Sequence, residues 1–317
     1  MDLGRIGIVV TGGGFKCAFQ VGFFQALDEY GIRAEKIQGI SGGCLNAAKY
    51  LEGGSATLKQ VWLAIEKNGY SSLFSRWDAV KHIAFASSAI FRDDGLNALV
   101  NQLNMENILN SPVNFEVVVW NEVAEKNEIF NNFDFKNQPF AAENFKRLIK
   151  ASASLPGFFS PEDINGNLYS DGCEFILNTF SELDTIFIID PSQPQPLAKT
   201  DDLKNLYQNL RWDKRIMKRF SSLIDRCMEK EIKYFCEVNK FKIFPEDRET
   251  HWLVFNHLKE FLSNLAGIQT KRLIAISPAI NISTLMLDFF QKGDISKAIT
   301  HGYESSREIL EKLTHNA

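Results

Sequence analysis

Apolar and polar positions near the N-terminus predict a strand, a helix and a second strand. Residues 6–10 form an almost wholly apolar run, which is typical of a buried strand. Apolar side chains then recur at helical spacing over 15–30, and Gly31 is placed to end this predicted helix. A short apolar segment around Ile37 predicts the next strand. This order predicts two parallel strands joined by a right-handed crossover.

The same patterns continue through the chain and predict an α/β protein. Further helices are predicted over 58–65, 96–109, 145–152 and 295–313, and further strands over 115–120, 185–189 and 273–276. Asp184 and Asp190 bound the apolar run 185–189, as expected of a buried parallel strand. Helices that alternate with strands along a chain place it in the α/β class.

Two glycine-rich turns follow the first two predicted strands. The first is Thr11-Gly12-Gly13-Gly14-Phe15-Lys16, and the second, Gly39-Ile40-Ser41-Gly42-Gly43, fits the GxSxG nucleophile elbow. A serine on a tight strand-to-helix turn points outward, and flanking glycines let the backbone reach the required angles. The amides of a glycine loop can stabilise an oxyanion, each contributing roughly 3 kcal/mol. The two turns therefore predict a nucleophile, Ser41, beside an oxyanion-binding loop.

A third block lies far downstream, in the alanine-, serine- and proline-rich stretch 151–161 and the segment 164–172 that ends in Asp171-Gly172. With this block the sequence resembles the patatin-like phospholipase family, whose motifs are a GGGx[KR]G loop, a GxSxG elbow and a DG[GA] turn. This chain reads GGGFKC, GISGG and DGC in the same order. The resemblance spans most of the chain and is weakest over 192–270.

The resemblance implies a three-layer α/β sandwich with a mainly parallel sheet. It also implies a lipid acyl hydrolase, similar to phospholipase A or lysophospholipase, that cleaves carboxylic esters with no cofactor and no metal. Its implied site is a Ser-Asp dyad without histidine, made of Ser41 and Asp171. The oxyanion hole would come from Gly12, Gly13 and Gly14, with Lys16 as an anion-binding residue and Gly39, Gly43 and Gly172 supporting the turns.

Two residues depart from the family motifs. Cys17 replaces the last glycine of the loop, and Cys173 follows Asp171-Gly172 where the family has a smaller residue. A left-handed backbone at Cys17 would be strained, because only glycine adopts it freely. We interpret both replacements as tolerated, with reduced activity as the alternative.

Other functions fit parts of the sequence. An α/β-hydrolase esterase would use a Ser-Asp-His triad with His251, His257 or His301 as base. That fold places several strands before its elbow, whereas only one strand and one helix precede the elbow here. A nucleotide-binding module would use the glycine loop, yet the third fingerprint glycine and the ribose-binding carboxylate are missing. An inactive membrane-binding relative is a third alternative. Asp190 is a rival carboxylate, and Lys16 could be merely solvated.

Length, charge and cysteine content set the broad class of the protein. With 317 residues the chain is expected to form one domain, 1–317, with a helical, basic insertion or lid at about 197–270. Its net charge of −4 gives no general attraction to nucleic acid. An odd count of five cysteines without paired spacing favours the cytoplasm. No signal peptide or spanning segment is predicted, with export by a signal-less route as the alternative.

The segment Lys204–Arg219 combines positive charge with an amphipathic pattern. It holds six cationic residues against Asp213 alone, together with Trp212. Such a stretch predicts peripheral docking onto anionic lipid, and a solvated helix face is the alternative. The expected partners are therefore a phospholipid or other acyl-lipid substrate and a membrane surface.

Overall fold

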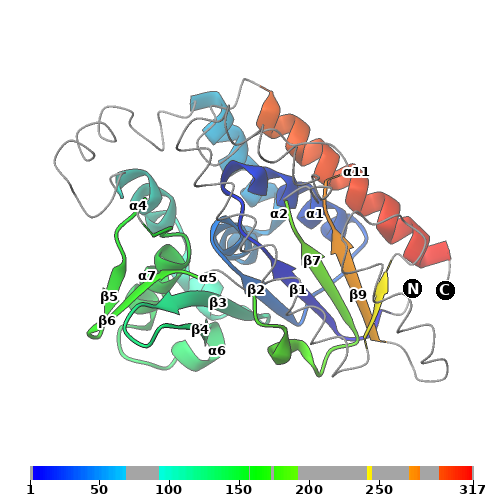
Figure 1. Ribbon diagram of the computed structural model, residues 1–317. Coiled ribbons are helices and arrows are strands. Elements are labelled where there is room, and N and C mark those ends of the chain that lie inside the picture. The colour runs from blue at the N-terminus through cyan, green and yellow to red at the C-terminus, as the bar shows by residue number, and fades with distance from the viewer. Residues whose placement is uncertain are drawn as a thin grey trace, which may run out of the picture.

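The computed structural model describes residues 3–68, 93–156, 158–172, 175–191, 241–244, 271–278 and 293–315 (Figure 1). The basic segment Lys204–Arg219 lies outside these residues. So does the rest of the expected 197–270 insertion, apart from the strand at 241–244. In the part of the chain that is described, no helix is long and apolar enough to cross a bilayer.

One mixed sheet organises the described residues. Its strands are β1 (Ile6–Val10), β2 (Lys36–Gly39), β3 (Asn114–Asn121), β4 (Lys126–Asn131), β5 (Glu162–Ile164), β6 (Asn167–Asp171), β7 (Thr185–Ile189), β8 (Phe241–Phe244) and β9 (Lys271–Ile276). They lie in the order β5-β6-β3-β2-β1-β7-β9-β8, with β4 also paired to β3. From β3 to β8 all neighbours are parallel, whereas β4, β5 and β6 pair antiparallel. The antiparallel strands therefore extend one end of a parallel sheet.

Helices connect and cover these strands. They are the 3-10 helix η1 (Gly14–Cys17), α1 (Ala18–Glu29), α2 (Gly42–Asn68), α4 (Asp94–Asn101), α5 (Met105–Leu109), α6 (Asn132–Phe135), α7 (Ala141–Ser152), the 3-10 helix η3 (Leu177–Phe180) and α11 (Asp294–His315). Figure 1 shows α1, α2 and α11 together beside β1, β7 and β9. The α/β fold of mostly parallel strands flanked by helices, predicted from the sequence, is confirmed.

The central strands are buried on both faces, as expected for a sheet between two layers. On β1, Ile8 and Val10 join the larger apolar cluster with α1, α2 and α11, whereas Val9 joins a second cluster on the other face. The second cluster contains Phe175 and Phe180, which follow β6 along the chain. Successive strand residues point to opposite faces, so each strand contributes to two cores.

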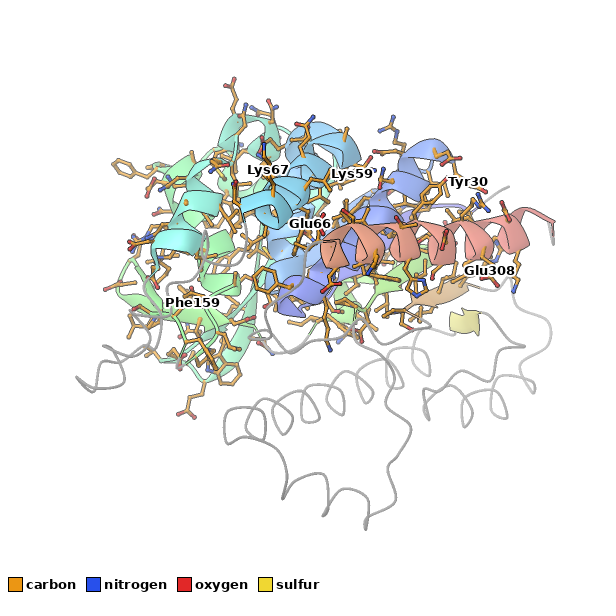
Figure 2. All side chains as sticks on the ribbon, turned by 90° about the horizontal axis from the view of Figure 1, so that it is seen from above. Tyr30, Lys59, Glu66, Lys67, Phe159 and Glu308 are labelled. Carbon is orange, nitrogen blue, oxygen red and sulfur yellow. The ribbon has the colours of Figure 1, made fainter. Side chains whose placement is uncertain are left out.

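Helix α11 packs against α1 with unusually close backbones. A Cβ added at Gly302 would lie 1.9 Å from the Phe19 oxygen, and one at Gly22 would lie 2.1 Å from the Ile299 oxygen. Glu66 of α2 accepts hydrogen bonds from the first amides of α11, at Ile295 (3.0 Å), and lies at that end of the helix in Figure 2. Glycines and a cap from a neighbouring helix thus fix the closing helix of the fold.

Most predicted elements occur, with one correction. Strands β1 and β7 have the predicted bounds, and Gly31 ends α1 with a φ of 64°. The single helix predicted over 96–109 is wrong, because two helices, α4 and α5, occupy that range. Asn104 separates them: its side chain accepts a hydrogen bond from the Asn107 amide and so caps a new helix.

Candidate active site

Ser41 lies on a sharp turn between β2 and α2. Its φ is 56°, a left-handed value that is rare outside glycine, and its side chain is half-buried. The turn needs its glycines, because a Cβ at Gly39 would lie 2.6 Å from Cys44 Cα and one at Gly43 would lie 2.3 Å from the Val10 oxygen. Strain of this kind often marks functional sites. The elbow geometry expected from the GxSxG pattern is therefore present.

Asp171 is the last residue of β6 and faces Ser41. Its carboxyl group is buried and accepts a hydrogen bond from the Ser41 hydroxyl. Burial raises the pKa of Asp171 well above its usual range, and the hydrogen bond from Ser41 lowers it in part. At Gly172 a Cβ would lie 2.8 Å from the Val118 oxygen, so only glycine fits at the position that follows β6. The structure thus brings together two residues that are far apart in the sequence.

The end of α7 holds both residues in place. The fully buried Ser152 hydroxyl accepts a hydrogen bond from the Ser41 amide (3.1 Å). Two residues later, the Ser154 carbonyl accepts one from the Asp171 amide (3.0 Å). Ser152 was not predicted as a site residue from the sequence, although the serine-rich stretch that precedes Asp171 indicated this segment.

The glycine loop lies directly against Ser41. A Cβ at Gly12 would be 2.7 Å from Ser41 Cβ and 3.1 Å from its Oγ, so no larger residue fits there. Gly13 and Gly14 have φ values of 155° and 58°, which favour glycine. Within the described chain, no residue accepts a hydrogen bond from the amides of these three glycines. These three amides are the candidate oxyanion donors.

Gly42 adds a donor that the sequence analysis missed. It is the first residue of α2, where helix amides have no partner within the helix. The amide of the residue after the nucleophile commonly contributes to the oxyanion hole in elbow sites, so Gly42 could have been predicted from the GxSxG motif. The positive end of the α2 dipole points to the same place.

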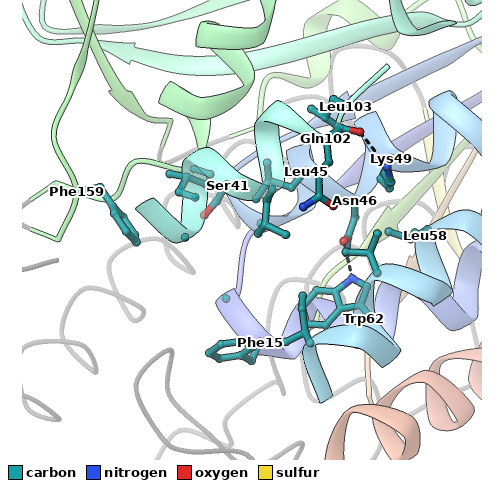
Figure 3. A pocket seen from close by; sticks show the side chains of 18 residues that line it. Phe15, Ser41, Leu45, Asn46, Lys49, Leu58, Trp62, Gln102, Leu103 and Phe159 are labelled. Atoms are coloured by element: carbon teal, nitrogen blue, oxygen red, sulfur yellow. Dashed lines mark hydrogen bonds between the residues drawn. The ribbon is translucent and has the colours of Figure 1, made fainter. Parts of the chain in front are cut away.

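A network of buried polar side chains holds the glycine loop in position. Gln20 donates to the Thr11 carbonyl (2.6 Å), and Asn46 donates to the Cys17 carbonyl (2.8 Å). Asn46 also donates to the Gln20 side chain (2.8 Å) and accepts from the Trp62 indole (2.8 Å; Figure 3). The carbonyls at both ends of the loop are therefore bound by buried side chains, which fixes the position of the loop beside Ser41.

Cys17 causes no backbone strain. Its φ and ψ are −60° and −11°, so the residue that replaces the last motif glycine is right-handed. Its thiol is fully buried, and burial raises its pKa. Lys16 is half-buried on the same loop. Cys173 lies outside the described residues.

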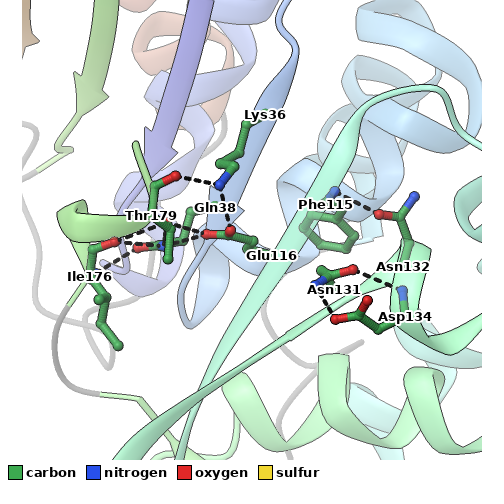
Figure 4. A network of polar contacts seen from close by, with 9 residues as sticks. All are labelled: Lys36, Gln38, Phe115, Glu116, Asn131, Asn132, Asp134, Ile176 and Thr179. Atoms are coloured by element: carbon green, nitrogen blue, oxygen red, sulfur yellow. Dashed lines mark hydrogen bonds and ion pairs between the residues drawn. The ribbon is translucent and has the colours of Figure 1, made fainter. Parts of the chain in front are cut away.

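A second network holds the segment that follows Asp171 against the other face of β2 (Figure 4). Gln38 accepts from the Ile176 amide (2.7 Å) and donates to the Ile176 carbonyl (3.1 Å). Glu116 accepts from Gln38 (2.8 Å) and Thr179 (2.7 Å), and it pairs with Lys36 (2.8 Å). Strand β2 therefore positions both the elbow and the chain that leaves Asp171.

Ser41 lines an apolar pocket (Figure 3). Helix α2 folds back on itself at Gly53 and Gly54, where the backbone is not helical, and its two arms form two walls. Helix α4 forms a third wall. The main apolar side chains are Leu45, Leu58, Val61, Trp62, Leu96 and Leu99. An apolar pocket of this kind suits an apolar ligand, and the Ser41 hydroxyl lines it.

The residues considered as alternatives to Asp171, which are Asp190 and the histidines, make other contacts where they are described. Asp190 is buried and accepts a hydrogen bond from the Thr11 hydroxyl (3.3 Å). His301 lies on α11 with its ring against Phe19, and burial lowers its pKa. His82, His251 and His257 are outside the described part of the chain. Among the described residues, no three potential metal ligands lie close enough together to hold a metal ion.

Comparison with known proteins relates the chain to one family and to solved structures. A family model described as Patatin-like phospholipase matches residues 8–179, which include the glycine loop, the elbow and Asp171. No curated protein matches the sequence significantly. Among solved structures, the crystal structure of VipD from Legionella pneumophila is similar, with 12% sequence identity and a TM-score of 0.43 over 98% of this chain and 67% of that chain.

Proposed function

The chain belongs to the patatin-like phospholipase family, a family of lipid acyl hydrolases, and we propose that it cleaves carboxylic ester bonds of phospholipids or related lipids with a Ser41–Asp171 dyad. The observation that carries this proposal is the hydrogen bond from the Ser41 hydroxyl to the buried Asp171 carboxylate, at the mouth of an apolar pocket. Serine esterases require a nucleophile, a base and an apolar acyl site, and these residues supply all three.

In the first half-reaction, Ser41 Oγ attacks the ester carbonyl and gives its proton to Asp171. The amides of the glycine loop, together with Gly42, stabilise the negative charge on the former carbonyl oxygen. Asp171 then passes the proton to the leaving alcohol, and the acyl group stays on Ser41. The raised pKa of Asp171 suits this step, because a carboxylate with a higher pKa is a stronger base.

In the second half-reaction, water takes the place of the alcohol. Asp171 accepts a proton from the water, which attacks the acyl carbonyl, and the same amides stabilise the second oxyanion. The proton returns to Ser41 Oγ as the fatty acid leaves, so the site ends as it began. None of these steps needs a metal or a redox cofactor. We also propose that Lys16, on the same loop, attracts the anionic head group of a phospholipid.

Release of fatty acid from a defined phospholipid tests the proposed function. Vesicles of a phosphatidylcholine with different acyl chains at its two positions, and separately a lysophosphatidylcholine, are incubated with the protein and analysed by mass spectrometry. We expect free fatty acid together with the matching lysophospholipid or glycerophosphocholine. No fatty acid from either lipid, together with thermal stabilisation by a nucleotide, would instead support the nucleotide-binding alternative.

Ser152→Ala tests whether the hydroxyl group at the end of α7 positions the elbow. Without this acceptor the Ser41 amide loses its partner, so we expect kcat to fall about tenfold, with KM within twofold. Ser152→Thr keeps the hydroxyl and should restore most of the rate. Ser306→Ala is a matched control, because it removes an equally buried hydroxyl from α11. Equal rates in the Ser152→Ala and Ser306→Ala variants would contradict the positioning role.

Charge reversal tests the proposed membrane contact. We propose that the protein works in the cytoplasm and reaches anionic membranes through Lys204–Arg219, whose local net charge is +5 (six cationic residues minus one acidic). Since each basic residue near such a surface contributes about 1 kcal/mol, a variant with Lys214, Arg215 and Lys218 changed to glutamate should bind anionic vesicles more weakly by orders of magnitude. The difference should shrink in high salt. Equal vesicle sedimentation of the variant and the wild type at low salt would reduce this segment to a solvated surface.

A further inference from the structure

The acyl pocket runs along one stripe of α2. Leu45 and Lys49 line it one helical turn apart, so they lie on the same side of α2, and Ser41, which also lines the pocket, directly precedes the first residue of this helix. At ~1.5 Å per residue, Lys49 lies ~12 Å from Ser41 along the helix axis. In Figure 3, Leu45 lies between Ser41 and Lys49. The stripe therefore leads from the nucleophile to a lysine.

Helix α4 and the residues after it form another wall of the pocket, of similar length. This wall extends from Gly95 to Gln102, which at ~1.5 Å per residue corresponds to ~10 Å. The two walls meet where Lys49 Nζ donates a hydrogen bond to the Gln102 carbonyl (3.3 Å; Figure 3). The pocket is therefore crossed by a polar contact at the end that lies away from Ser41.

That end of the pocket is charged, and its charges already have partners. Lys49 pairs with Glu52 (2.8 Å), and the two side chains are only 13% and 14% exposed. Glu52 also accepts a hydrogen bond from the Asn104 amide (3.1 Å), where α5 begins. An alkyl chain that reached this cluster would have to displace a largely buried ion pair, which is strongly unfavourable.

We propose that the Lys49–Glu52–Gln102 contact closes the acyl pocket and makes the enzyme select acyl chains of medium length. An extended chain advances ~1.25 Å per carbon, as follows from C–C bonds of ~1.5 Å at tetrahedral angles, so ~12 Å holds about 8–10 carbons. Up to that length each added methylene is buried among leucines and raises kcat/KM by up to about fourfold. This inference rests on the proposed function, because it assigns a substrate class to the same site.

The test measures kcat/KM for p-nitrophenyl esters of 4, 8, 10, 12 and 16 carbons, below their critical micelle concentrations. The wild type should reach its maximum at the 8- or 10-carbon ester and fall at least ~10-fold at 16 carbons. Leu45→Trp fills the pocket one helical turn from Ser41, so its maximum should move to the 4-carbon ester. Lys49→Ala combined with Glu52→Gln removes the ion pair without leaving a lone buried charge and should move the maximum to 12 carbons or more.

Each outcome separates this inference from the function on which it rests. If the wild type hydrolyses all the esters without a maximum, or if all three proteins share one maximum, the length selection is wrong and the hydrolase proposal stands. If the wild type hydrolyses no ester and releases no fatty acid from phospholipids, the proposed function fails and this inference fails with it. Should the double variant not fold by circular dichroism, the wild-type profile and Leu45→Trp decide the matter.

Discussion

Asp171→Asn is expected to lower kcat/KM for ester hydrolysis by at least ~100-fold while raising the melting temperature at neutral pH. The rate falls because an amide cannot accept the proton of Ser41. The stability rises because the wild type keeps a carboxylate in a buried position, where its pKa is well above the usual range. A neutral group of the same size escapes that desolvation cost.

The stability gain should depend on pH in a defined direction. Because burial raises the folded-state pKa of Asp171 above the value it has in the unfolded chain, protonated Asp171 favours the fold, and the wild type loses this contribution as the pH rises through the folded-state pKa. Asparagine does not titrate. The melting temperature of the variant should therefore equal that of the wild type near pH 4 and exceed it by a few degrees at pH 8. Thermal unfolding at several pH values measures the difference.

The activity of the wild type should follow the same group. Asp171 accepts a proton only when it is ionised, so kcat/KM should fall as the pH drops through its raised pKa. Asp163→Asn is a matched control, since it removes an exposed carboxylate from the same β5–β6 hairpin. His301→Asn and the corresponding changes at the other histidines should stay within a few-fold of wild type. A large loss from one folded histidine variant would establish a triad in place of the dyad.

Ser41→Ala is expected to lower hydrolysis by roughly 1,000-fold or more and to leave the melting temperature within a few degrees. The loss is large because no other described hydroxyl combines the elbow, the loop amides and the Asp171 hydrogen bond. The fold is spared because only one half-buried hydroxyl is removed. Rates on a short-chain ester and on a phospholipid, with Ser305→Ala on α11 as control, measure the effect. Retained hydrolysis in the folded variant would contradict the assignment of Ser41 as the nucleophile.

The sequence predicted those parts of the site whose geometry is local. An elbow serine between glycines and a glycine loop after a strand can be identified within a few residues, because each depends on backbone angles that few residue types adopt. The loop and Ser41 indeed lie side by side, with Gly12 too close to Ser41 for any side chain. The family motifs also selected Asp171 over Asp190, and Asp171 is the carboxylate that Ser41 contacts.

The pocket could not be predicted in the same way. Its shape depends on the reversal of α2 at Gly53 and Gly54, and a helix predicted over 58–65 does not reveal which helix it packs against. Gln38 and Glu116 are polar residues in otherwise apolar predicted strands. Polar side chains in strands usually face solvent. Only the fold shows that they are buried and that they hold the chain after Asp171. Contacts between residues more than 70 positions apart leave no periodic trace in a single sequence.

Labelling with a fluorophosphonate tests the central claim, that Ser41 is an activated nucleophile, most directly. The probe reacts with serines that are deprotonated by a neighbouring base and leaves a stable adduct that mass spectrometry can locate. We expect one adduct per chain, on the peptide that contains Ser41, with none in Ser41→Ala and slow formation in Asp171→Asn. No adduct on the folded wild type, or an adduct on a different residue, would contradict the account.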